Sequence, residues 1–267
     1  TRVSAARAHL PGRVASPRLA AGPAERALLT WQQVAPSGAF IMRSERSAGL
    51  WRHPQSLGEA VSFAPDAYEP EILIGSDGEA LHCWNQWMSP GYGVALARRG
   101  SHDEGFEGPA HVRDVLSPDL LFSNAPLLAR NDRGDALVTW YQSVGGPLVT
   151  FVSERHGEMG AFSRPDPAAS LSPADAPLFA PVENPEAALA ADGRAAVVWR
   201  QELAEGMAVF LATRSAGGVW QSPADIDETF SLPVDLAIDT RVGFAAEHLY
   251  VVWRADSGDD RAIYLAH

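Results

Sequence analysis

Three carboxylates lie where the chain could carry out hydrolysis. Glu71, Glu186 and Asp239 each stand at the opening of a strand that recurs along the sequence. Carboxyl groups at such openings could act as general acid and general base. Crowded carboxylates raise one another's pKa unless arginine or a cation pairs with them, so a plain ion pair with Arg18 is the alternative role of Glu71 or Glu186. These three are the candidate catalytic residues.

Polar and aromatic residues recur at the same end of the repeat. Glutamines follow a repeated tryptophan by two residues, and such an amide can hydrogen-bond a neighbouring loop as well as a ligand. The segment WNQWMSPGYG places Trp87, Met88 and Tyr92 on a predicted exposed turn, where they could stack on a sugar or peptide or pack on the next loop. The predicted ligand-binding residues are Glu69, Gln86, Trp87, Tyr92, Asn124, Gln142, Asn184, Arg200, Gln201 and Arg254.

A repeat of about 50 residues organises these positions. Five tryptophans, each closing a similar apolar run, lie 53, 56, 59 and 54 residues apart at Trp31, Trp84, Trp140, Trp199 and Trp253. Fourteen residues before each of them stand Pro17, Pro70, Pro126, Pro185 and Asp239. In three copies a glycine precedes the tryptophan by six residues, in tight turns that need a positive φ, at Gly78, Gly134 and Gly193.

Each copy predicts four strands. The first follows the proline, the second ends near the tryptophan, the third is a further apolar run, and the fourth carries a second aromatic. Short strands with Gly and Pro punctuation indicate an all-β chain, and four strands per repeat are typical of a propeller blade. We therefore predict one domain, a five-bladed β-propeller of four-stranded antiparallel blades, with blades at about 17–62, 63–118, 119–177, 178–231 and 232–267 plus 1–16.

The last copy ends after its third strand, which leaves one outer strand to be supplied from elsewhere. Residues 1–16 precede the first repeat, and we expect them to join the last blade and close the ring. The spacing places the expected aromatic of that strand before Thr1, so either Val3 takes its place or upstream sequence has been lost. The tryptophans are expected to fill the space between blades.

The amino-acid composition argues against some classes of binding partner. The formal charge of -12 argues against a nucleic acid or an anionic membrane surface, which need a basic footprint. All 21 basic residues are arginine, which either reflects a GC-rich genome or serves planar anion recognition. No apolar run is long enough to span a bilayer and no signal peptide is visible, although a chain that begins at Thr1 is expected to have lost a leader or an upstream segment.

Familiar catalytic and metal motifs are absent. Cys83 is the one cysteine, expected as a buried small hydrophobe, and no histidine pair has metal-ligand spacing. His102, Asp103 and Glu104, with Glu107, could bind a cation but are better explained as a solvated loop. No metal or other cofactor is expected.

The turns from Asp77-Gly78 to Trp84 and from Asp192-Gly193 to Trp199 resemble the repeats of sialidase-like bacterial exported propellers. The Asp-box of sialidases has serine and threonine at set places and joins other strands, and their arginine triad and tyrosine nucleophile have no counterpart here. The resemblance implies an exported or periplasmic propeller. Five-bladed propellers of this kind include arabinanase-type and fructosidase-type glycoside hydrolases, which use three inner-strand carboxylates, and sugar-binding lectins.

Three functions fit these observations. The first hypothesis is a non-catalytic propeller that recognises a glycan or a protein on its central face. The alternative is a glycoside hydrolase that uses the inner-strand carboxylates Glu71, Glu186 and Asp239. A third is a scaffold module in a larger extracytoplasmic assembly.

Overall fold

The structure is a computed structural model. It describes residues 10, 12–101, 105–109, 114–118, 122–143, 145–175, 182–257 and 260–267. The chain divides into two compact units, residues 1–115 and residues 116–267. In the described part of the chain no helix is long and apolar enough to cross a membrane.

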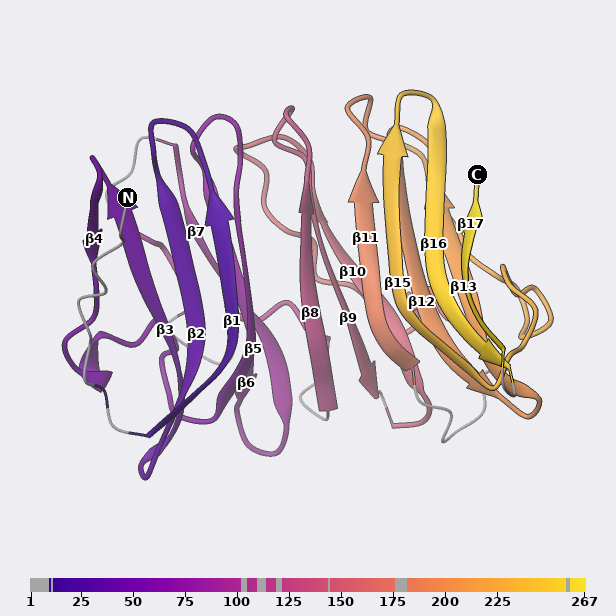
Figure 1. The fold of residues 1–267 in the computed structure, drawn as a ribbon, viewed down its shortest axis with the longest axis horizontal. Coiled ribbons are helices and arrows are strands. Elements are labelled where there is room, and N and C mark those ends of the chain that lie inside the picture. The colour runs from indigo at the N-terminus through magenta and orange to yellow at the C-terminus, as the bar shows by residue number, and fades with distance from the viewer. Residues whose placement is uncertain are drawn as a thin grey trace. The chain divides into compact units, whose positions relative to one another are not determined.

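The first unit contains two antiparallel sheets, each drawn from one copy of the repeat (Figure 1). The first sheet has the order β1 (Arg13–Ala21), β2 (Ala27–Ala35), β3 (Gly38–Ser47) and β4 (Leu50–Arg52), followed by a short 3-10 helix η1 (Leu57–Glu59). The second has the order β5 (Ala67–Ile74), β6 (Ala80–Trp87) and β7 (Tyr92–Arg99).

The second unit contains three further antiparallel sheets of the same pattern. The third sheet consists of β8 (Phe122–Arg130), β9 (Ala136–Ser143) and β10 (Leu148–Arg155), and the fourth of β11 (Val182–Leu189), β12 (Ala195–Leu203), β13 (Gly206–Arg214) and β14 (Trp220–Gln221). The fifth consists of β15 (Leu236–Ala245), β16 (His248–Ser257) and β17 (Asp260–Ala266). An all-β chain of five antiparallel sheets is what the repeat predicted, whereas the single-domain boundary stays a prediction.

The predicted fourth strand forms in only two of the described sheets, as the short strands β4 and β14. In the second sheet it is reduced to one bridge between Arg98 and Glu107, and in the third to a backbone hydrogen bond from Ser163 to Glu154. The prediction of four strands in every blade therefore holds for two of the described sheets and not for the other three. A short, broken outer strand leaves few backbone groups unpaired at the sheet edge, which limits edge-to-edge association.

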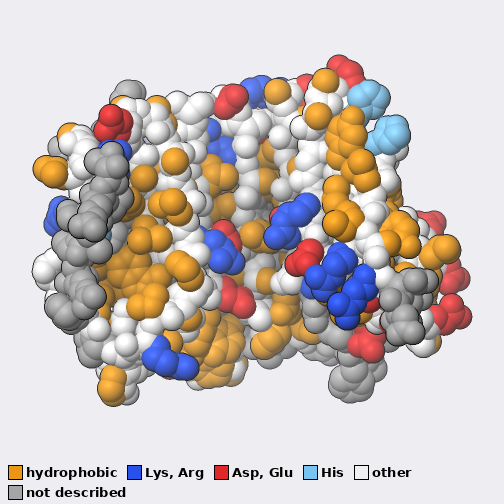
Figure 2. Space-filling model, in the orientation of Figure 1, with side chains coloured by type: hydrophobic (Ala, Val, Ile, Leu, Met, Phe, Trp, Pro, Cys, Tyr) orange, Lys and Arg blue, Asp and Glu red, His pale blue; other side chains and the backbone are white. Residues whose placement is uncertain are grey.

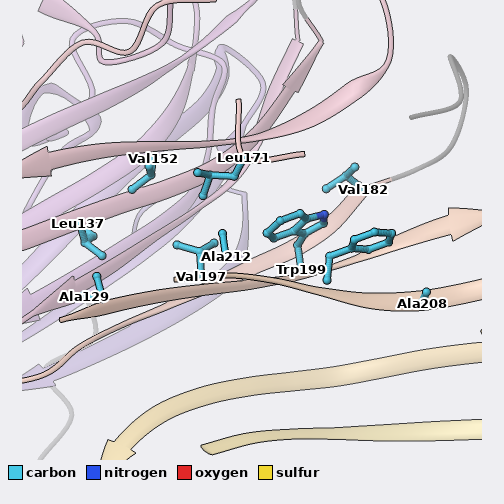
Figure 3. Close-up of a cluster of buried hydrophobic side chains, with 11 residues drawn as sticks. Ala129, Leu137, Val152, Leu171, Val182, Val197, Trp199, Ala208 and Ala212 are labelled. Atoms are coloured by element: carbon cyan, nitrogen blue, oxygen red, sulfur yellow. The ribbon is translucent and has the colours of Figure 1, made fainter. Parts of the chain in front are cut away.

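Successive sheets pack face to face within each unit. β5 packs against β1, β2 and β3, while in the second unit β11 packs against the third sheet and β15 against the fourth. Buried side chains of neighbouring sheets fill the space between them, and the repeat tryptophan belongs to this core. One such cluster holds Val152 and Leu171 of the third repeat with Val182, Val197 and Trp199 of the fourth (Figure 3).

The repeat tryptophan and the glutamine two residues later form one structural unit. In four sheets the indole Nε1 donates a hydrogen bond to the glutamine Oε1, at 3.2, 3.1, 2.9 and 3.4 Å for Trp31–Gln33, Trp84–Gln86, Trp140–Gln142 and Trp199–Gln201. All eight side chains are buried. Because a buried N–H without a partner is costly, the glutamine is what allows the large indole to be buried whole.

The repeat proline does not begin its strand, contrary to the prediction. Each first strand starts three or four residues earlier and passes through a β-bulge at the proline, with the register shifting between Tyr68 and Glu71 in the second sheet. The residue just before the proline has a positive φ, as at Ser16 (48°), Glu69 (51°), Ala125 (50°) and Asn184 (46°), and so has Asp239 (54°). A bulge leaves a residue outside the ladder, so it accommodates a proline that has no N–H to donate.

The glycines of the turns between the first and second strands have the predicted left-handed backbone. Gly78, Gly134 and Gly193 have φ of 91°, 81° and 95°. At Gly134 a Cβ atom would also lie 2.7 Å from the backbone nitrogen of Glu158. Glycine is therefore required there by conformation and by space.

The predicted ring-closing strand is partly wrong. Arg13–Ser16 belong to β1, and Arg13–Ala15 pair with β2, with Arg13 opposite Val34, so they are unable to serve as the outer strand of the last sheet. The bulge at Pro17 explains the error, because it lets the first strand extend ahead of the proline. Residues 1–9 and 11 of the predicted strand lie outside the described residues.

A recurring arginine was missed, although it follows the tryptophan by fifteen residues in four copies, at Arg46, Arg99, Arg155 and Arg214. Arg155 and Arg214 donate to the carbonyls of Gly134 and Gly193, at 2.8 and 3.3 Å, and so fasten the glycine turn. The guanidinium of Arg155 also lies over the ring of Phe162, with 5.3 Å from Cζ to the ring centroid. These arginines use the planar geometry of the guanidinium, which lysine lacks.

Replacing the glutamine should destabilise the fold. Gln142→Ala leaves the buried Trp140 Nε1–H without its acceptor, so we expect the free energy of unfolding to fall by about 1–3 kcal/mol. Chemical denaturation measures this, and a double-mutant cycle with Trp140→Phe isolates the pair. Effects of the two substitutions that add without coupling would contradict the hydrogen bond's role.

Acid should weaken the turn that Asp135 closes. Burial works to raise the pKa of Asp135, but hydrogen bonds from Asn131, the Gly157 N–H and Arg133 outweigh it and hold the pKa below its usual value. The carboxylate therefore stabilises the fold above its unfolded-state pKa, and this stability is lost as pH falls through the lower folded-state pKa. We expect Asp135→Asn to be less stable than the parent at pH 7 and to converge with it in acid. Denaturation curves across this pH range measure the difference, and a gap that stays constant would contradict the assignment.

Candidate functional site

One end of the second sheet collects most of the chemistry-bearing residues of the first unit. The start of β5 and the turn between β6 and β7 lie together there, since Ala67 pairs with Gln86 and Trp87 pairs with Tyr92. This is the strand opening at which the sequence predicted a site. Loops on a rigid sheet commonly carry binding and catalytic residues.

Three aromatic rings meet at this end. Tyr92 makes edge-on contacts with both Trp87 and Tyr68, with ring centroids 5.0 and 5.7 Å apart. Trp87 is 39% exposed, and Tyr68 and Tyr92 are half-buried. The prediction that the turn exposes its aromatic side chains holds for Trp87, whereas Met88 is buried. The partly open rings offer an apolar surface on which a sugar could stack.

A carboxylate and an amide lie beside these rings. The Asn85 side-chain amide donates to Glu69 Oε2 at 3.0 Å, and Asn85 itself is buried. Residues that pair across strands share one face, which places Tyr68 with Asn85 and Glu71 with Cys83. Asn85, Cys83 and Trp87 alternate along β6 and so share that face too. We name Tyr68, Glu69, Asn85, Trp87 and Tyr92 the aromatic–carboxylate cluster.

The backbone of Glu69 holds its side chain in this place. Glu69 is the positive-φ residue of the β-bulge, a conformation that costs about 1–3 kcal/mol for a residue other than glycine. Bulges re-aim side chains and are frequent next to active sites. Asp239 and Asn184 occupy the same place in the β-bulges of their first strands, although by the repeat spacing Asp239 corresponds to the proline, and both are exposed.

The residue after the bulge forms an ion pair between first strands of adjacent sheets. In the first unit Arg18 Nε donates to Glu71, and in the second unit Arg241 Nη1 donates to Glu186 at 2.8 Å. Figure 2 shows acidic side chains lying directly against arginines at several places on the viewed face. Two of the three candidate catalytic carboxylates are thus held by a guanidinium, which fixes their orientation.

The third candidate, Asp239, belongs to a network on the fifth sheet. Arg254 lies 3.5 Å from Asp239 and 3.6 Å from Asp256, and Arg261 lies 3.7 Å from Asp256. The side chain of Asp239 is 68% exposed, so it is open to a ligand. Within the second unit, Glu186 and Asp239 therefore have different arginine partners.

The remaining predicted ligand residues fall into two groups. Gln86, Gln142, Gln201 and Arg200 are buried; the glutamines accept from tryptophans, and Arg200 donates to the Ala237 carbonyl. Asn124 instead donates to the Tyr141 hydroxyl at 2.9 Å, next to the exposed ring of Phe122. Burial inside the fold gives the first group a packing role, and ligand binding by any of these residues stays a prediction.

Sequence reasoning missed Tyr68 and Asn85. Their signal was positional: Tyr68 lies two residues before the repeat proline, and Asn85 directly follows the repeat tryptophan. The described residues contain no group of three or more His, Cys, Asp or Glu able to hold a metal ion. The loop residues His102, Asp103 and Glu104 lie outside the described part. Cys83 is buried as expected, and burial raises the pKa of its thiol well above the ordinary value.

No protein-family model matches the sequence, and no match was found among the curated proteins. Solved structures do match its fold. An endo-arabinase from Bacteroides thetaiotaomicron is 12% identical, with 97% of this chain and 94% of that one covered and a TM-score of 0.50. The Hadza microbial sialidase Hz136 is 14% identical, with 95% and 56% covered and a TM-score of 0.53. A protein of unknown function from Dyadobacter fermentans is 10% identical, with 92% and 77% covered and a TM-score of 0.56.

These matches support the propeller-like fold and the resemblance to sialidase-like propellers, at the level of architecture. They also correct the first functional hypothesis. Enzymes that act on carbohydrates recur among the similar structures, and a thermostable family-43 glycoside hydrolase is another. Non-catalytic recognition of a glycan or protein was therefore the wrong choice, and the glycoside hydrolase alternative is the better supported one.

Contact with Tyr92 should be measurable in the titration of Tyr68. Burial raises the pKa of the Tyr68 hydroxyl above its usual value, and the charge and hydrogen bond of Tyr92 add to this. We expect Tyr92→Phe to lower the pKa of Tyr68 part of the way back, as followed by NMR of the labelled ring. Tyr264→Phe, on the fifth sheet, is the control, and an unchanged titration of Tyr68 in Tyr92→Phe would contradict the contact.

Proposed function

We propose that this protein is a glycoside hydrolase whose substrate meets the strand openings of the inner strands. The observation that carries the proposal is the aromatic–carboxylate cluster at the opening of β5. It combines a half-open aromatic surface, a carboxylate fixed by a buried amide, and a second carboxylate two residues away. The fold likeness to an endo-arabinase and a sialidase supports the same class of reaction.

The cluster suits a sugar better than a charged or purely apolar ligand. Trp87 and Tyr92 present apolar ring surface, and the Tyr68 hydroxyl keeps its proton because its pKa is raised by burial. The Tyr68 and Tyr92 hydroxyls hydrogen-bond each other, which leaves one O–H of the pair to donate while Glu69 accepts, and sugar hydroxyls need both kinds of partner. The cluster thus provides stacking and two-way hydrogen bonding at one place.

The carboxylates that we propose for the chemistry in the first unit are Glu69 and Glu71, while Glu186 and Asp239 stay candidates in the second unit. Hydrolysis of a glycosidic bond needs one group to protonate the leaving oxygen and another to attack or to activate water. Glu71 is bound to a guanidinium, which favours an ionised carboxylate and hence the role of nucleophile or base. Glu69 accepts from a neutral amide and is the better candidate in this cluster for the acid.

The same proposal includes a closed five-bladed ring and an exported protein. Five sheets of one repeat, each packed on the next within its unit, support the ring. The likeness of the turns to those of exported sialidase-like propellers supports secretion or a periplasmic location.

Activity should appear on polysaccharide and depend on these carboxylates. We expect the purified chain to release reducing sugar from a panel of arabinan, other soluble polysaccharides and nitrophenyl glycosides. Glu69→Gln and Glu71→Gln should each lower kcat by about 10²–10⁴-fold, the usual contribution of an acid or base. Glu186→Gln and Asp239→Asn test whether the second unit contributes carboxylates as well.

Glu247→Gln is the matched control, because Glu247 is exposed on the turn at the far end of β15 and β16. It should retain full activity. Release of sugar that none of the four inner-strand substitutions diminishes would refute the assignment of the carboxylates. Absence of release on the whole panel would refute the proposed reaction.

A further inference from the structure

Arg43 occupies a position that every other copy of the repeat gives to an aliphatic residue. The residue paired with the repeat tryptophan on the third strand is Met42, Ala95, Phe151, Phe210 or Tyr264. The residue after it is Arg43 in the first sheet and Leu96, Val152, Leu211 or Leu265 in the others. The fold is therefore built with Leu or Val at this position, and an arginine there needs another reason.

The arginine is costly where it stands. Burial, partly offset by Glu45, lowers the pKa of Arg43 to about 10, and Nη1 is buried with no hydrogen-bond partner among the described residues. Its guanidinium lies over the Phe106 ring, with Cζ 3.8 Å from the ring centroid. Glu45, whose charge acts on Arg43, is bound by Arg99. A half-buried cation that carries a buried, unused donor is destabilising unless something pairs with it.

A cavity of about 290 Å³ opens beside this side chain. It is lined by Arg43, Glu45, Arg52, His53, Pro54 and Glu59, from β3, β4 and the segment up to η1. His53 is fixed by a 2.8 Å contact between Nδ1 and Ser44 Oγ and by stacking on Trp51. Glu59 is engaged in turn by the Gln55 backbone N–H, at 2.8 Å.

The equivalent cavity in the second unit has a different lining. There Val152 takes the place of Arg43, beside Glu154, Leu171 and Trp220, in a space of about 400 Å³. The cavity of the second unit is lined by apolar side chains, serines and one glutamate, whereas that of the first unit carries two arginines and a histidine beside two glutamates. The two cavities occupy equivalent places in the repeat and differ in the side chains that line them.

We infer that the cavity beside Arg43 binds an oxyanion group, a carboxylate, phosphate or sulfate, of a small molecule. Arg43 and Arg52 each line the cavity with a planar set of donors, and guanidinium groups bind oxyanions with two hydrogen bonds at once. His53 is fixed through Nδ1, so its other ring nitrogen can hydrogen-bond the ligand. The volume suits a small molecule of about the size of one sugar acid. This site shares no residue with the aromatic–carboxylate cluster and stands independently of the proposed hydrolysis.

Calorimetric titration of the whole chain with inorganic phosphate, sulfate, glucuronate and glucose tests the inference. We expect at least one of the three anions to bind and neutral glucose not to bind at this site. Tighter binding of glucuronate than of the inorganic ions would identify an acidic sugar as the source of the oxyanion, and the reverse order would identify a free or esterified phosphate or sulfate.

Arg43→Leu is the decisive variant because four other repeats carry Leu or Val at this position. We expect it to weaken anion binding at least tenfold and to raise the melting temperature of the ligand-free chain, since it removes a half-buried charge whose Nη1 donor is unsatisfied. Arg13→Leu, an exposed arginine on β1, should change neither. Arg52→Gln is the second test and should weaken binding without raising the melting temperature.

Two results would overturn the inference. One is the failure of all three anions to bind. The other is binding of equal strength in the parent, Arg43→Leu and Arg52→Gln, which would locate the anion elsewhere.

Discussion

Burial of one indole ring per repeat is the constraint on which the rest of the structure depends. The ring supplies a large apolar surface to the packing between sheets, but its N–H needs an acceptor away from water. The glutamine two residues later satisfies it in four sheets, on the same strand and the same face. In the fifth copy Ala255 stands at that place, although Trp253 is as buried as Trp31, each being 8% exposed.

Once the second strand is anchored by its tryptophan, the first strand can tolerate strain. Its bulge holds a residue with a positive φ in every copy, and the side chains around that bulge are the polar ones of the inner strand. Glu69, Asn184 and Asp239 share this position, while Glu71 and Glu186 follow it and are oriented by arginines. The second strand is regularly paired, whereas the first strand is bulged and turns its polar side chains out at the strand opening. The candidate site therefore lies at that opening.

The arginine-only composition also gains a physical explanation. Arg155 and Arg214 fasten a turn by a carbonyl contact while stacking on an aromatic ring, and Arg214 also pairs with Glu154 of the preceding sheet. One planar side chain thus satisfies several partners at once. Lysine could supply the charge in such a position but not the stacking.

The sequence by itself determined the repeat, the all-β class, the five tryptophan anchors and the three glycine turns, because these depend on spacing and on local backbone preference. It also located the strand opening as the candidate site. Tertiary structure alone decided that the prolines sit inside bulges, that Arg13–Ser16 belong to the first sheet, and that Tyr68 and Asn85 complete the cluster around Glu69. The physical reason is that strand register and the pairing of side chains from different strands arise only when the sheets form and pack, whereas a repeated spacing is already present in the unfolded chain.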